Sequence, residues 1–178
     1  FYNTPVISGF QGNLSIATKE DGTSTLHAST VPVSLSGTYN NGPIGALLAY
    51  ERNALEDKYW QIGASYKVGP AKLMASYART KFGDTGNSFD AFNTTERVAP
   101  DSKTKGWLLG AIITAGPGNV LVGYGQKKPD NFETIKQASL GYEYILSKRT
   151  FLYTDVMNIR RSGTKTTNTF DVGIHHNF

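Results

Sequence analysis

The sequence predicts an all-β chain folded as an antiparallel up-and-down sheet, and three observations support this prediction. Apolar and polar side chains alternate with a period of two residues, the period at which a strand presents side chains to its two faces. Short turns alternate with longer polar links, as in a meander whose turns lie at one rim and whose loops lie at the other. No segment has the i, i+3, i+4, i+7 apolar spacing of an amphipathic helix.

The alternation of side chains is clearest in residues 31–39, 59–67, 137–146 and 169–178. In the second of these, Trp60 and Ile62 fall on one face, and Gln61 and Lys67 fall on the other. Such a strand has one apolar face and one polar or small face. The whole pattern predicts ten strands, at about residues 12–18, 30–39, 43–52, 57–67, 71–82, 104–115, 119–128, 134–146, 150–160 and 168–178.

The connections between these strands are of two kinds. The short turns are rich in Gly, Asn, Pro and Ser, and they lie at residues 40–43, 68–71, 116–119 and 147–150. Gly and Asn tolerate a positive φ, and Pro fixes φ, so these residues favour tight turns. The longer links lie at about 18–29, 52–57, 83–104, 128–134 and 161–167. No linker or change in composition divides the chain, so residues 1–178 are expected to belong to a single domain.

Composition excludes several classes of protein. The 178 residues include no Cys, so a disulfide framework and a Cys-based zinc or redox site are impossible. The longest near-apolar run, 107–115, is about half of the ~20 residues that a membrane-spanning helix needs. The net charge is +4, and Lys and Arg are scattered rather than gathered in a basic run, so no nucleic-acid partner is expected.

The composition of the two faces favours a barrel in a membrane over a soluble one. The polar face consists mainly of Gly, Ser, Gln, Thr and Asn, and only 18% of the chain is charged, against roughly 25% in soluble domains. Aromatic residues lie at the ends of the apolar face, namely Tyr39, Tyr50, Trp60, Tyr66 and Trp107. This placement is typical of the two interfacial girdles of a transmembrane β-barrel. A soluble β-barrel or sandwich with its apolar face inside remains an alternative.

Three stretches of the chain carry a family resemblance. Residues 2–10 have the form of a strand end, a short turn and a strand start. Residues 140–153, with Leu140-Gly141-Tyr142-Glu143-Tyr144 followed by Leu146-Ser147-Lys148-Arg149-Thr150, resemble a penultimate hairpin. The closing segment 170–178 ends in a terminal Phe. In this order they resemble the C-terminal part of a general trimeric bacterial porin of the β-proteobacterial or neisserial type. The histidines and Asn at 175–177 depart from the Arg-rich variant more common in that family.

The resemblance implies an antiparallel up-and-down transmembrane β-barrel of about sixteen strands when complete. This chain would supply about ten of them, and residues 1–178 would be the C-terminal part of the single barrel domain. Residues 1–9 would hold the tail of the preceding strand and its turn. The resemblance also implies a homotrimer in the outer membrane of a Gram-negative bacterium, in contact with outer-membrane lipid and inserted by the barrel-assembly machinery.

The function implied is a water-filled channel for passive diffusion of small ions and polar solutes, without a cofactor. The residues expected to face the water are Gln61, Lys67, Lys72, Ser76, Lys127, Gln137, Ser139 and Glu143. The resemblance further implies a lipid-facing edge that serves as the C-terminal assembly signal, made of Phe170, Val172, Ile174 and Phe178. Since wall lysines are nearly balanced by Glu51, Glu143, Asp155 and Asp171, only a weak preference for anions is expected.

Candidates for other chemistry are sparse. His27 lies in an expected loop, and His175 and His176 are adjacent, so they point to opposite faces of a strand and cannot hold one metal together. The Asp-containing loops lack the spacing of a calcium site. We therefore expect no metal site and no enzymatic activity. The alternatives are a soluble or plugged β-barrel with a ligand-binding or structural role, and an outer-membrane barrel enzyme.

Overall fold

A computed structural model describes residues 1–18, 30–83, 89–90, 93–97 and 99–177. Eleven strands form one sheet and two more form a separate hairpin. The strands are β1 (Tyr2–Asn3), β2 (Phe10–Ile16), β3 (Val33–Asn41), β4 (Ile44–Arg52), β5 (Lys58–Val68), β6 (Ala71–Lys81), β7 (Phe89–Asp90), β8 (Asn93–Arg97), β9 (Lys103–Ala115), β10 (Gly118–Pro129), β11 (Ile135–Ser147), β12 (Thr150–Arg161) and β13 (Thr167–His176). The described residues include no helix that is long and apolar enough to cross a membrane.

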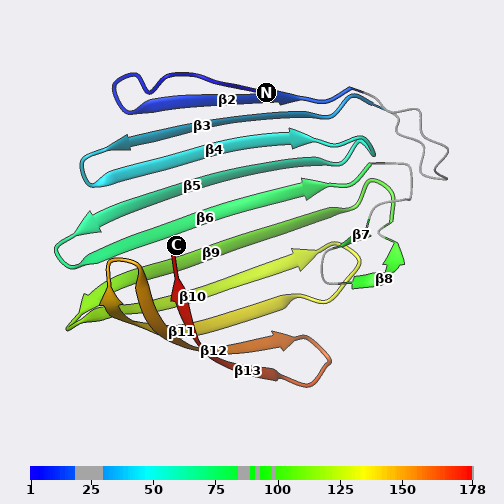
Figure 1. The fold of residues 1–178 in the computed structure, drawn as a ribbon. Coiled ribbons are helices and arrows are strands. Elements are labelled where there is room, and N and C mark those ends of the chain that lie inside the picture. Colours follow the sequence, from blue (N-terminus) through cyan, green and yellow to red (C-terminus); the bar gives the residue numbers. More distant parts are fainter. Residues whose placement is uncertain (19–29, 84–88, 91–92, 98, 178) are drawn as a thin grey trace.

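The large sheet is an antiparallel meander in which strands pair in chain order from β1 to β6 and from β9 to β13. This confirms the predicted all-β, up-and-down fold. The one departure is the link between β6 and β9, which was expected to be a loop. Part of it forms the β7–β8 hairpin outside the large sheet, beside the loop ends of the strands (Figure 1).

Strand ends differ from the prediction near the N-terminus. β2 begins at Phe10 rather than 12, because Ser8 and Gly9 both adopt positive φ, 50° and 87°, and complete the turn just before it. β3 begins at Val33 rather than 30; Pro32 precedes it and has no N–H to donate to a ladder. The expected tail of a preceding strand is present as β1, which pairs with β2.

The two rims of the sheet differ as expected. We call one the turn rim, at residues 42–43, 69–70, 116–117 and 148–149, where consecutive strands are joined by tight turns. Gly42 and Gly69 have φ of +55° and +54° there, a conformation that favours glycine. We call the other the loop rim, where the links 53–57, 82–102, 130–134 and 162–166 connect the strands.

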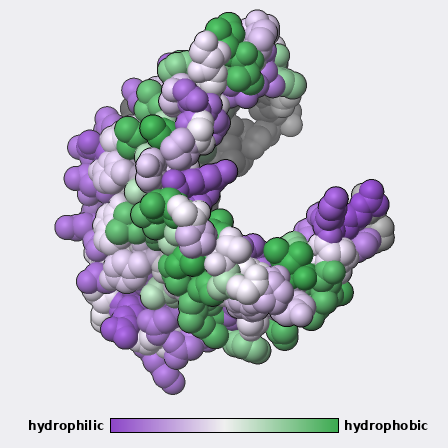
Figure 2. Space-filling model, turned by 90° about the vertical axis from the view of Figure 1, so that its left-hand side faces the viewer, coloured by the Kyte–Doolittle hydropathy of each residue, from purple (hydrophilic) through white to green (hydrophobic). Residues whose placement is uncertain are grey.

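The sheet is curved, and its two faces differ in crowding. We call the face carrying Trp60, Ile62 and Tyr66 the outer face, and the face carrying Tyr59 and Gln61 the inner face. Along β5 the outer-face residues are exposed, while the inner-face residues up to position 65 are half-buried. Curvature crowds side chains on the concave side, so the inner face is the concave one. Figure 2, viewed from the turn rim, shows the sheet as an open curve around a hollow.

The apolar side chains of the sheet do not form a central core. Among the described residues, Phe82 is the one large hydrophobic side chain that is buried, at 7% exposure. Ile62, Leu140 and Val172 are 53%, 51% and 67% exposed on the outer face. A soluble sheet of this size would bury such residues. The fold therefore presents its apolar surface to the outside, as a transmembrane barrel does.

Candidate functional site: the inner face of the sheet

The strand registers place every described residue that was expected to face water on the inner face. Pairings across the sheet set these residues on one side: Gln61 with Ala78, Gly63 with Ser76, Lys67 with Lys72, Gly123 with Ser139, Gly125 with Gln137, Lys127 with Ile135, and Asn119 with Glu143. Strand β9 joins these two groups of strands. Its inner-face residues pair with Ser76 and Ala78 on β6 and with Gly123 and Gly125 on β10, so all of these positions lie on one face. The period-two alternation thus separates the two faces correctly at these positions.

Lys67 and Lys72 lie opposite each other at the turn rim, on β5 and β6. Lys67 is exposed and Lys72 is half-buried. The pair concentrates positive charge at one place on the inner face, and the two like charges repel each other across the strands.

A shallow groove of about 460 Å³ crosses the inner face from β5 to β11. Its lining includes the polar residues Tyr59, Ser76, Thr80, Thr104, Gln126, Lys127 and Gln137, beside apolar residues such as Leu108 and Ile135. The Tyr59 hydroxyl donates to Gln61 Oε1 at 2.8 Å. Thr104 is 7% exposed, and its hydroxyl has no hydrogen-bond partner among the described residues. The groove is therefore a hollow in the wall with a mixed polar and apolar lining, and the Thr104 hydroxyl lies buried beneath its surface.

Sequence reasoning missed several residues of this groove. Tyr59 alternates with Trp60 and could have been included on that signal alone. Leu108 also lines the groove, opposite Ser76, and Ile112 lies on the same face, opposite Lys72. They fall in the near-apolar run 107–115, where hydropathy does not alternate and cannot assign the faces.

The inner face also carries acidic residues in hydrogen-bonded pairs. Glu143 accepts from Asn119 Nδ2 at 3.4 Å, and Glu51 accepts from the Ser34 hydroxyl at 3.2 Å. Asp155 and Asp171 lie opposite each other on β12 and β13. The basic inner-face residues of the sheet are Lys67, Lys72, Lys127 and Arg161, and the acidic ones are Glu51, Glu143, Asp155 and Asp171. Charge on this face is therefore balanced.

Aromatic side chains gather at both rims of the outer face. Near the loop rim, Trp60 packs against Tyr77 with ring centroids 5.3 Å apart, and Trp107 packs against Tyr124 at 5.6 Å. Near the turn rim, Phe10 packs against Tyr39 at 4.3 Å. Rings at these two levels, with aliphatic side chains between them, match the interfacial girdles of membrane barrels.

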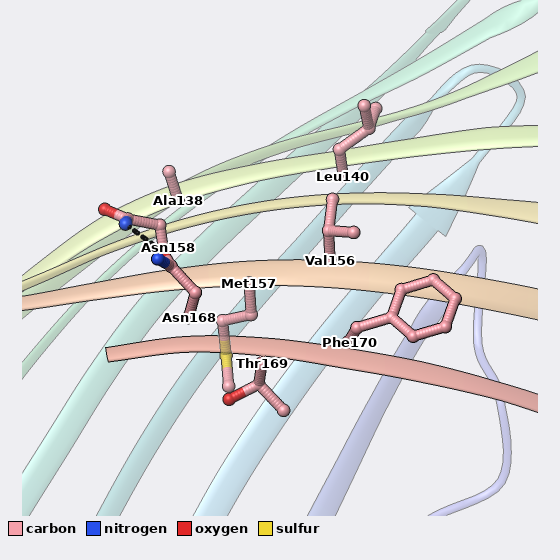
Figure 3. Close-up of a pocket in the computed structure, with 8 residues that line it drawn as sticks. All are labelled: Ala138, Leu140, Val156, Met157, Asn158, Asn168, Thr169 and Phe170. Carbon is pink, nitrogen blue, oxygen red and sulfur yellow. Dashed lines mark hydrogen bonds between the residues drawn. The ribbon is translucent and has the colours of Figure 1, made fainter. Parts of the chain in front are cut away.

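The expected C-terminal edge lies on the outer face. Phe170, Val172 and Ile174 are 67%, 67% and 65% exposed on β13, opposite Val156, Thr154 and Leu152. Phe178, the last residue of this expected edge, lies outside the described residues. Figure 3 shows the outer-face groove beside Phe170, with Leu140 and Val156 projecting from the neighbouring strands.

The histidines form no cluster in the described part of the chain. His175 stacks on Phe151 with centroids 4.8 Å apart, while His176, on the opposite face, shares a 2.8 Å hydrogen bond with the Thr150 hydroxyl. No group of His, Asp and Glu in the described residues could hold a metal ion. His27, the acidic stretch 19–22 and residues 84–88 lie outside the described residues.

Comparison with known proteins places this architecture in a family. Residues 1–164 match the model of the Gram-negative porin family. The chain is 30% identical to outer membrane porin protein 32 of Delftia acidovorans, over 93% of this chain and 46% of that protein. It is 28% identical to an outer membrane porin protein of Bordetella pertussis, over 85% of this chain and 49% of that protein.

A solved structure gives the same result for the fold. The anion-selective porin from Comamonas acidovorans superposes with a TM-score of 0.82 at 26% identity, covering 99% of this chain and 58% of that chain. The present chain spans about half the length of the curated relatives it matches. Because the family model matches residues 1–164, the chain belongs to the Gram-negative porin family.

Proposed function

We propose that this chain forms the C-terminal part of a single β-barrel domain that serves as a water-filled channel in a bacterial outer membrane. The observation that carries the proposal is the division of the sheet into an exposed apolar outer face and a polar concave face. Both edge strands, β1 and β13, have a neighbour on one side only. Open edges expose unpaired backbone groups, which lipid does not tolerate, so further strands would close the barrel.

The proposed mechanism is passive diffusion of small ions and polar solutes, which needs no catalytic step. A column of water inside the barrel lowers the barrier to a polar solute crossing the apolar layer. The residues proposed to line it are Gln61, Lys67, Lys72, Ser76, Lys127, Gln137, Ser139 and Glu143, which lie together on the concave face. The groove from β5 to β11 adds Tyr59 and Thr80 to the proposed lining.

A weak preference for anions is part of the proposal. Its support is the likeness to the anion-selective Comamonas porin, together with Lys67 and Lys72 at the turn rim. The net charge of +4 does not support it, since inner-face charges balance. At physiological salt, a wall charge more than ~8 Å from an ion is largely screened and has little effect on it. Ion selectivity therefore depends on charges at the narrowest part of the channel.

The same family supports two proposals about assembly. We propose a homotrimer inserted by the barrel-assembly machinery, with the edge formed by Phe170, Val172 and Ile174, together with Phe178, as the signal for insertion. The exposure of the first three on the outer face of the last strand supports that role.

Single-channel recording of the full-length protein in a planar bilayer tests the proposal. Stepwise conductance is expected, and a salt gradient should give a reversal potential of the sign set by a mild anion preference. A membrane-inserted, folded protein without conductance would overturn the channel and favour a plugged barrel. A folded protein that stays in solution without detergent would overturn the membrane assignment.

A further inference from the structure

The inner face carries open apolar surface in the groove of about 460 Å³ that runs from β5 to β11, which we call the wall groove. Leu108 lies on the inner face opposite Ser76 and Gly125, and its side chain is 53% exposed. Ala78 and Ile135 add apolar surface to the same groove. Water is displaced favourably from apolar surface, so a solute with an apolar part would gain free energy by covering Leu108.

A glycine leaves an open notch within the wall groove. Gly106 has Ala78 on β6 and Lys127 on β10 as register partners, and its neighbours on the same face of β9 are Thr104 and Leu108. All five residues line the groove. Among the described residues, a Cβ built at Gly106 would meet a single atom within 4 Å, a backbone oxygen of β10 at 3.4 Å. The notch therefore has an apolar side chain on one side and an ammonium group on the other.

Two hydrogen-bond donors lie on the β10–β11 side of this notch. Lys127 is opposite Ile135, and Gln137 follows Ile135 by two residues, so the two donors are diagonal neighbours on the inner face. Such neighbours lie about 7–8 Å apart, within reach of long side chains. Both donors line the groove, and both are half-buried. An ammonium and an amide N–H donate well to a carboxylate, so the groove offers a carboxylate site beside apolar surface.

The acidic residues of the described strands lie too far away to cancel the charge of Lys127. Glu51 on β4 is four strands away, about 19 Å at the usual strand spacing. Measured along β11 from Ile135, the other acidic inner-face residues lie at least about 20 Å away, and they are Glu143, Asp155 and Asp171. Charges at physiological salt are screened beyond ~8 Å. Arg161, opposite Ile135 on β12, is nearer at about 10 Å and is also positive.

Carboxylates in the neighbouring loops make contacts of their own at the loop rim. Asp57 Oδ1 accepts a hydrogen bond from the Gly83 backbone N–H at 2.8 Å, and Asp130 Oδ2 accepts one from the Lys103 backbone N–H at 2.9 Å. The carboxylate of Glu133 lies against Gly163 in the next loop. The charge inside the wall groove itself is therefore that of a lysine, and it favours an anionic solute.

We propose that the wall groove binds small amphipathic monoanions, namely carboxylates that carry an aromatic ring. The carboxylate accepts hydrogen bonds from Lys127 and Gln137, while the ring covers Gly106 and contacts Leu108. The groove volume of about 460 Å³ falls within the roughly 300–1,000 Å³ of small-molecule sites. Because the groove is shallow and open to the lumen, binding is weak and the solute can leave again, as passage through a channel requires. The inference rests on the proposed function in that the concave face meets water.

Saturation-transfer NMR of the folded full-length protein in detergent tests this site, because the method measures weak binding without requiring conduction. The probes are benzoate, benzamide and acetate. Benzamide keeps the ring and lacks the charge, whereas acetate keeps the charge and lacks the ring. We expect benzoate to bind more tightly than either. Added salt should weaken the binding of benzoate and leave that of benzamide unchanged.

Three variants locate the site. Gly106→Leu fills the notch and should abolish the binding of benzoate. Gly110→Leu is the matched control: it adds the same side chain to the same face of β9, its Cβ would also have a β10 backbone oxygen as nearest atom at 3.4 Å, and Gly110 does not line the groove. Lys127→Gln should weaken benzoate about 5-fold, the contribution of one partly exposed ion pair, and leave benzamide unchanged.

Several outcomes would overturn the amphipathic site. Equal affinity for benzoate and acetate, or for benzoate and benzamide, would show that ring and charge are not recognised together. Equal losses in the two glycine variants would show that benzoate does not bind in the notch. If Gly106→Leu does not fold, Leu108→Ser should weaken both aromatic probes and spare acetate. Conductance without benzoate binding overturns this inference alone, whereas selective benzoate binding without conductance overturns the channel alone.

Discussion

The ring of Tyr153 on β12 occupies the space that a side chain at Gly173 on β13 would need. A Cβ at Gly173 would lie 2.5 Å from the Tyr153 hydroxyl oxygen and 2.6 Å from Cζ. The two residues are register partners on the inner face. An aromatic ring laid over a glycine on the next strand is a known way to fix strand pairing, and here it fixes the last strand of the sheet.

Gly173→Val should therefore destabilise the barrel by ~1–3 kcal/mol, because the ring must leave its position. Equilibrium unfolding by urea in lipid vesicles measures this. If the clash is the cause, adding Tyr153→Ala should recover part of the loss. Strictly additive effects of the two substitutions would show that the ring and the glycine do not interact.

The depth of a residue on the outer face sets the cost of placing a charge there. Leu140 lies near the middle of β11, so Leu140→Arg should cost ~2–4 kcal/mol in a bilayer. Ile174 lies two residues from the end of β13, so Ile174→Lys should cost only ~0–1 kcal/mol. Ser139→Arg is the matched control, since it places a charge beside Leu140 on the inner face. Equal costs at 139 and 140 would contradict the assignment of faces.

Asp155 and Asp171 face each other across β12 and β13, and both are exposed on the inner face. Opposed like charges destabilise a strand pair, so Asp155→Asn should stabilise the protein by ~0.2–1 kcal/mol. It also removes a negative charge from the proposed channel wall. The reversal potential in a salt gradient should then move toward anion preference. A shift toward cations, or lower stability, would count against this arrangement.

Strand positions could be predicted because, along most strands, the outer face between the two rims is mainly apolar while the inner face is mainly polar or small. In β5 the alternation over 59–67 predicts the observed strand Lys58–Val68 closely. In β9 the prediction of the strand is correct, but its faces could not be assigned from hydropathy, since Leu108 and Ile112 face inward beside other apolar residues. Pairing with β6 is what assigns them, and pairing is a property of the fold.

The gathering of basic residues on the outer face near the loop rim could not be predicted either, because it depends on how the strands pair. In the sequence, Lys58, Lys81, Lys103 and Lys105 read as scattered charges at loop edges. Registers running across neighbouring strands bring them to one face near the loop rim, where Lys58, Lys81 and Lys103 are aligned and Lys105 lies two residues further along β9. The separate β7–β8 hairpin was likewise not predictable, because its short strands lie within a polar link and pair only with each other.

The ion pair between Lys81 and Asp101 at the loop rim should make stability depend on pH in the acidic range. The Asp101 carboxylate accepts a hydrogen bond from Lys81, and this bond and the Lys81 charge hold the pKa of Asp101 below its ordinary value of 3.8, with Lys103 and Lys58 adding smaller effects. A lowered pKa means that the folded protein favours the charged form. The stabilising effect of the pair is therefore complete above 3.8 and is lost as the pH falls through the lowered value.

Lys81→Gln should accordingly raise the pKa of Asp101 toward 3.8, because it removes both the hydrogen bond and the nearest charge. Lys58→Gln is the matched control: it removes an equal charge whose effect on Asp101 is the weakest of the three lysines, and it should move the pKa far less. Carboxyl carbon NMR of the labelled protein across acidic pH follows the titration. Both groups are exposed, so thermal stability at neutral pH should change little. An unaltered Asp101 titration in Lys81→Gln would mean that the pair does not persist in solution.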